Sequence, residues 1–105
     1  MFKSTENKGF QITFSNGYTI SCQFGASNYC HNYGRHLEAD YRICEEMSKR
    51  IHSCDDCEVA IWNKHRKWIT GDVMKAVGID SFEEEVQANV TADEVAKIIA
   101  YVAAM

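Results

Sequence analysis

The sequence predicts an α+β domain in which a small antiparallel sheet of three to four strands packs against two main helices. The first observation is a hairpin pattern near the start of the chain. Residues 10–14 alternate between apolar and polar, Asn16 and Gly17 follow, and residues 18–24 alternate again. Asn-Gly is the preferred pair for a type I′ turn, whose two central residues both need positive φ. We therefore expect an N-terminal hairpin with one apolar face.

The second observation is a further strand pair around a charged turn at residues 63–67. Residues 58–62 (EVAIW) form a short apolar run bounded by turn residues, and residues 68–70 are expected to be the returning strand. The next segment is less regular. Val73, Met74 and Val77 have the spacing of a short helix that ends at Gly78, while residues 82–90 fit either a strand or a loop.

The third observation is helical spacing in two longer segments. Residues 37–50 place Leu37, Tyr41 and Cys44 on one apolar stripe, which predicts a helix of about four turns. A second helix is expected from about residue 92 to near the C-terminus. Thr91 and Glu94 precede its apolar residues with the spacing of a capping box.

Length and composition predict a single domain, residues 1–105. The chain has 46% apolar and 25% charged residues, which excludes wholesale disorder. Its net charge of -4 makes direct nucleic-acid binding less expected than protein binding. It has neither an apolar run of about 20 residues, as a membrane span needs, nor a signal-peptide stretch at its start. We therefore expect an intracellular protein whose cysteines are thiols or metal ligands.

Five cysteines and four histidines are the unusual part of the composition. Cys22 lies on the apolar face of its expected strand and Cys44 on the apolar stripe of the first helix, so both are predicted core residues. The other cysteines and all the histidines fall in expected loops. If the strand at residues 58–62 runs antiparallel to the one at 18–24, the loops before and after these strands share one edge of the sheet.

A structural zinc site is the chemistry that this shared edge suggests. Cys54 and Cys57 form a C-x2-C pair, and His31 and His36 have the H-x4-H spacing of zinc ligands. Four protein ligands would close the coordination shell, so the zinc would be structural. The predicted ligands are His31, His36, Cys54 and Cys57, with Cys30 and His52 as alternates. The alternative is an exposed loop with two inert thiols. A redox pair is disfavoured because a strand, not a helix, follows the motif.

Two further clusters are candidates for partner binding. Trp62 and Trp68 enclose Lys64, His65, Arg66 and Lys67, and aromatic side chains beside cations can hold single-stranded nucleic acid. The alternative is a solvated hairpin turn. Asp80 and the run Glu83, Glu84 and Glu85 form an acidic patch that could face a basic partner. The sequence has no phosphate loop and none of the common hydrolase motifs, so we predict that the protein is not an enzyme.

Three segments resemble a family of small, largely uncharacterised proteins of bacterial viruses and mobile elements. They are residues 9–30 (GFQITFSNGYTISCQFGASNYC), 58–62 (EVAIW) and 91–103 (TADEVAKIIAYVA). The family pattern has a cysteine at Cys30 but lacks the Cys54 and Cys57 pair, so a zinc site would be special to this protein or a subgroup.

This resemblance implies a function as well as a context. It points to an anti-defence factor of the anti-CRISPR type, acting in the cytoplasm of a bacterial host cell. The expected function is a non-enzymatic inhibitor that binds a host defence protein such as a CRISPR nuclease. The alternatives are a zinc-stabilised nucleic-acid-binding accessory protein and a small thiol enzyme.

Overall fold

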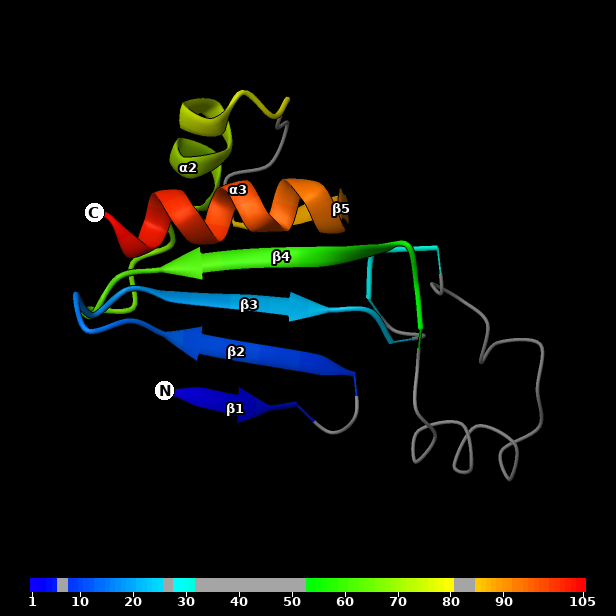
Figure 1. Ribbon diagram of the computed structural model, residues 1–105, viewed down its shortest axis with the longest axis horizontal. Coiled ribbons are helices and arrows are strands. Elements are labelled where there is room, and N and C mark those ends of the chain that lie inside the picture. Colours follow the sequence, from blue (N-terminus) through cyan, green and yellow to red (C-terminus); the bar gives the residue numbers. More distant parts are fainter. Residues whose placement is uncertain (6–7, 26–27, 32–52, 81–84) are drawn as a thin grey trace.

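The computed structural model describes residues 1–5, 8–25, 28–31, 53–80 and 85–105, and it is an α+β fold. In this part of the chain, five strands form one antiparallel sheet in the order β1-β2-β3-β4-β5, and two helices accompany it (Figure 1). The elements are β1 (Phe2–Ser4), β2 (Gly9–Thr13), β3 (Thr19–Gln23), β4 (Asp56–Trp62), α2 (Thr70–Val77), β5 (Gln87–Thr91) and α3 (Ala92–Ala103). The predicted helix at residues 37–50, with Cys44, lies outside the described residues.

The predicted N-terminal hairpin is confirmed, with a different turn. Strands β2 and β3 pair with Phe10 opposite Cys22. Of the two turn residues, only Gly17 has positive φ, at 89°, so the turn is not type I′. Instead, the Gly17 N–H donates to the Phe14 carbonyl, and the Tyr18 carbonyl accepts from the Phe14 N–H. This is the three-residue loop in which a glycine in left-handed conformation follows a tight turn.

The sheet has one strand more than the upper limit predicted. Strand β1 pairs with β2 and places Phe2 opposite Ile12. Its three residues are all exposed, and the N-terminal amine of Met1 donates to the Thr13 carbonyl at 2.7 Å. A strand this short, with no buried face, has no alternating pattern to reveal it.

Only one strand of the second predicted pair is confirmed. The strand predicted at residues 58–62 lies within β4, which pairs antiparallel with β3. The returning strand at 68–70 is wrong, because Trp68 makes a single bridge to Trp62 and α2 begins at Thr70. The Thr70 hydroxyl accepts from the Ile61 N–H at 2.9 Å and so replaces further strand pairing. As expected, α2 ends at Gly78, whose φ is 81°.

Strand β5 and helix α3 complete the fold and the core. Residues 82–90 fitted either a strand or a loop, and part of this segment is the strand β5, which pairs with β4. Helix α3 begins with the predicted capping box of Thr91 and Glu94. Both helices pack on one face of the sheet, where their apolar side chains meet the buried residues of β3 and β4. These core residues include Ile20, Cys22, Val59, Ile61, Val73, Met74, Ile98 and Val102.

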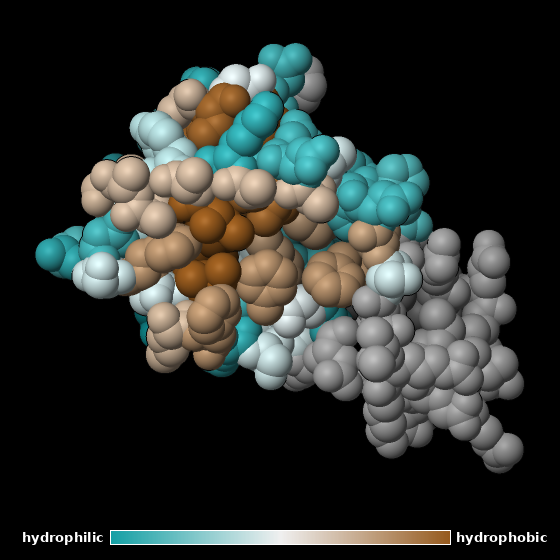
Figure 2. All heavy atoms as spheres, viewed as in Figure 1, coloured by the Kyte–Doolittle hydropathy of each residue, from teal (hydrophilic) through white to brown (hydrophobic). Residues whose placement is uncertain are grey.

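The helices leave part of their own side of the sheet uncovered. Figure 2 shows apolar side chains gathered below α3, over the strands β3 and β2. Phe10, Phe14 and Phe24 are half-buried and pack against the core. Neither of the two described helices has the length and apolar character that crossing a bilayer requires.

Candidate metal centre

Two chain segments meet at the end of β3 and the start of β4. Because these strands are antiparallel, the residues after β3 lie beside those before β4. Three hydrogen bonds hold residues 28–31 there. The Tyr29 N–H donates to Glu58 Oε2 at 3.0 Å, its carbonyl accepts from the Asn89 N–H at 3.0 Å, and the His31 N–H donates to Asp56 Oδ1 at 2.8 Å. The strand adjacency assumed from the sequence is therefore confirmed.

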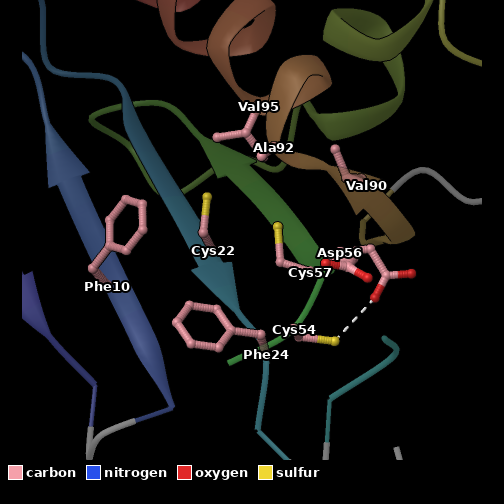
Figure 3. Close-up of a pocket in the computed structure, with 10 residues that line it drawn as sticks. Phe10, Cys22, Phe24, Cys54, Asp56, Cys57, Val90, Ala92 and Val95 are labelled. Carbon is pink, nitrogen blue, oxygen red and sulfur yellow. Dashed lines mark hydrogen bonds between the residues drawn. The ribbon is translucent and has the colours of Figure 1, made fainter. Parts of the chain in front are cut away.

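Cys30, Cys54 and Asp56 come together at this meeting point. One possible ligand atom from each lies within 4.8 Å of the other two. Cys30 and Asp56 are buried and Cys54 is half-buried. The Cys54 thiol points at the carboxylate and donates to Asp56 Oδ1 at 3.2 Å (Figure 3). Two thiols and a carboxylate at this separation are close enough to bind one metal ion.

The Asp56 carboxylate is ionised at this site. Burial alone raises the pKa of the carboxyl, but hydrogen bonds from Asn89, His31 and Cys54 outweigh burial and lower the pKa to about 2. Both oxygens are used. Oδ1 accepts from the His31 N–H and the Cys54 thiol, and Oδ2 accepts from the Asn89 amide at 2.8 Å and faces the His31 ring. A buried negative charge beside two thiols favours a cation.

Cys57, one of the predicted zinc ligands, lies on the opposite face of β4. A C-x2-C pair chelates when a turn aims both sulfurs the same way, but β4 begins at Asp56. Successive side chains of a strand alternate, so Asp56 and Cys57 lie on opposite faces of β4 and Cys57 points into the core. Cys54 precedes the strand, and its thiol contacts Asp56. The Cys57 thiol contacts Cys22, and this hydrogen bond together with burial raises the pKa of Cys57. Figure 3 shows the two sulfurs side by side.

The predicted histidines divide into one that is near the cluster and two that are not described. His31 Nδ1 lies 2.5 Å from Asp56 Oδ2, and its side chain is 77% exposed. His36 and His52 lie outside the described residues. The alternate ligand Cys30 belongs to the cluster. Asp56 was not predicted, although the CDDC motif contains it, because the C-x2-C spacing points to the two cysteines and not to the carboxylates between them. The signal that indicates it is the strand after the motif, which sends Asp56 and Cys57 to opposite faces.

A small apolar pocket lies behind the cluster, between β2, β3, β4 and the start of α3. Its volume is about 250 Å³. Phe10, Phe24 and Val95 form its apolar wall, and Cys22 and Cys57 also line it (Figure 3). The half-buried Cys54 lines the same pocket, so small molecules that enter it can approach this thiol.

The other predicted binding residues are far from this edge. Trp62 and Trp68 stack at a tilt, with ring centroids 5.5 Å apart, and Lys64, Arg66 and Lys67 are exposed in the turn between them. Glu85 is exposed, while Glu83 and Glu84 lie outside the described residues. Comparisons of the chain with protein-family models, with curated proteins and with solved structures gave no match. Its function is therefore argued from these sites.

Proposed function

We propose that the protein binds a structural zinc ion that ties the segment after β3 to the start of β4. The observation that carries this proposal is the approach of Cys30, Cys54 and Asp56 to within 4.8 Å. Thiolate ligands favour zinc over the harder magnesium and calcium ions. His31 contacts Asp56 and is the proposed fourth ligand, although its ring nitrogens are not part of the group within 4.8 Å, so the ring would have to turn toward the two thiols.

Zinc would stabilise the fold because its ligands come from segments far apart in the sequence. Cys30 and Cys54 are separated by the segment 32–52, and one shared ion joins its two ends. Metal binding needs thiolates, so each cysteine ligand releases a proton, while Asp56 is already ionised. The free energy of metal binding then adds to the free energy of unfolding.

Elemental analysis and native mass spectrometry of the purified protein test the zinc site. We expect about one zinc per chain, lost in Cys54→Ser and in Cys30→Ser. Cys57→Ala is the matched control. It removes the other cysteine of the C-x2-C motif, but this cysteine lies in the core and is not a proposed ligand. Circular dichroism establishes that each variant is folded. A folded wild-type chain that holds no zinc and takes up none when zinc is added would overturn the proposal, and zinc loss in Cys57→Ala alone would assign different ligands.

The proposed wider role is a non-enzymatic inhibitor of a host defence protein, such as a CRISPR nuclease, in the cytoplasm of a bacterial host cell. The family resemblance supports it, and the net charge of -4 suits a partner with a basic surface. Pull-down and nuclease-inhibition assays against CRISPR effectors test it. Failure to bind or inhibit any effector would count against this role and would leave the zinc proposal standing.

A further inference from the structure

The turn between β4 and α2 is held by hydrogen bonds and carries exposed cations. The Asn63 side-chain oxygen accepts from the His65 N–H at 2.9 Å and from the Lys67 N–H at 3.0 Å. Arg66 is held with φ at 62°, a left-handed conformation that favours glycine. The backbone is therefore fixed by the turn itself, and the side chains at 64–67 all reach solvent.

Two tryptophans and Arg66 line a hollow beside this turn. Trp62 and Trp68 face each other across the bridge that joins them, and Trp68 is 46% exposed. With Gln11 and Arg66 they enclose a hollow of about 530 Å³. Ile61 points into the core, so its neighbour Trp62 points to the opposite face, away from the helices.

Cations gather at and beside the hollow although the chain is acidic: Arg66 lines it, and the adjacent turn carries Lys64 and Lys67. Lys64, Arg66 and Lys67 are exposed, and within the described part of the chain none of them forms an ion pair. Lys3 adds a fourth cation, since it pairs with Gln11 in the neighbouring strand. The carboxylate of Glu58 is on the same face but four residues along β4 from Trp62, where it accepts from the Tyr29 N–H.

We propose that this hollow binds single-stranded nucleic acid, with one base stacked on Trp68 and the adjacent phosphates contacting Arg66, Lys64 and Lys67. Aromatic faces beside cations are the pairing that holds unpaired bases irrespective of sequence. An acidic peptide would use the cations and leave the exposed ring of Trp68 without a partner. The proposal is independent of the zinc site, which lies at the other end of β4.

The tryptophans make the site directly observable. The chain has two tryptophans, and both line the hollow. We titrate the protein with an oligothymidylate of about ten nucleotides and follow intrinsic fluorescence. Stacking should quench it. With three phosphate contacts, the logarithm of the affinity should fall with the logarithm of salt at a slope of about -2, or roughly 20-fold between about 50 and 200 mM.

Four variants locate the binding, measured by anisotropy of a labelled oligonucleotide. Arg66→Gly suits the left-handed backbone and removes one cation, so the slope should fall by about 0.7. Trp68→Ala should weaken binding about tenfold, and Trp68→Phe should weaken it less. Lys97→Gln removes an exposed cation of α3 and should change little. Absence of quenching at low salt, or equal effects of Lys97→Gln and Arg66→Gly, would overturn the proposal. Equal quenching by polyglutamate would overturn it in favour of a protein ligand.

Discussion

Replacing Asp56 by asparagine should destabilise the protein strongly, because this side chain joins three segments of the chain. Its two oxygens accept from His31 and Cys54 on one side and face Asn89 and the His31 ring on the other. Asparagine keeps the shape but has a single oxygen. Whichever way its amide turns, the NH₂ group faces one obligate donor, either the His31 N–H or the Asn89 amide. That donor is left unpaired, and the hydrogen bonds that remain no longer go to a charged group, which together should cost about 3 kcal/mol.

Urea unfolding monitored by circular dichroism, with EDTA present to remove any metal, measures this loss. With a slope of about 1.5 kcal/mol per molar, the midpoint should fall by about 2 M. Asp55→Asn is the matched control, since Asp55 is the exposed neighbour and should change the free energy of unfolding by less than about 0.5 kcal/mol. If Asp56→Asn behaves like this control, the hydrogen bonds to Asp56 do not stabilise the fold and the reasoning fails.

The difference in stability between wild type and Asp56→Asn should also depend on pH when both are measured in EDTA. The pKa of Asp56 is lowered from its ordinary value to about 2, so the folded state favours the ionised carboxylate. Its contribution to stability is complete above about pH 4 and is lost as the pH falls through about 2. The difference in stability between wild type and Asp56→Asn should shrink over this window. A difference that stays constant down to pH 2 would contradict the assignment.

Three further predictions concern the helix cap, the hairpin and the thiols. Thr91→Ala removes the capping box of α3 and should lower the free energy of unfolding by about 1 kcal/mol in thermal melts, whereas Thr91→Ser should not. Gly9→Ala places a Cβ 1.9 Å from the Cys22 carbonyl oxygen and should cost about 3 kcal/mol; an unchanged urea midpoint would show that β2 and β3 pair differently. In metal-free protein, iodoacetamide should label Cys54 before Cys57, whose pKa is raised, and mass spectrometry of timed samples will detect any reversed order.

Much of the fold could be predicted from the sequence because one face of most elements is buried. Alternation in residues 10–14 and 18–24, and the capping box at Thr91, depend on nearest neighbours and local spacing, and both are confirmed. Strand β1 has no buried face, so only its pairing with β2 defines it. The false strand at 68–70 has a similar cause. Its short apolar pattern fits either a returning strand or the start of a helix. The hydroxyl of Thr70 favours the helix start through hydrogen bonds with the Ile61 N–H and the Glu85 carbonyl.

The location of the candidate site could be predicted from the sequence, but the identity of its ligands could not. Antiparallel pairing of two strands is enough to bring the segments around residues 30 and 54 together. The choice of ligands depends instead on where β4 begins. Had the chain turned at residues 55 and 56, Cys54 and Cys57 could have faced one ion. Because it is extended from Asp56 onward, the Asp56 carboxylate lies beside Cys30 and Cys54, and Cys57 joins Cys22 in the core.

Strand β4 carries both proposed sites, and this gives a last test of their independence. Its odd-numbered residues 57, 59 and 61 lie in the core, so its even-numbered residues share the face away from the helices. Asp56 begins this face and Trp62 ends it, about 20 Å apart at about 3.3 Å per residue. At this distance salt screens any direct effect of one charge cluster on the other. Cys54→Ser should therefore lose zinc and keep its oligonucleotide affinity, while Arg66→Gly should keep zinc and bind the oligonucleotide more weakly. If Cys54→Ser also weakens oligonucleotide binding, or Arg66→Gly also loses zinc, the two sites are coupled through β4.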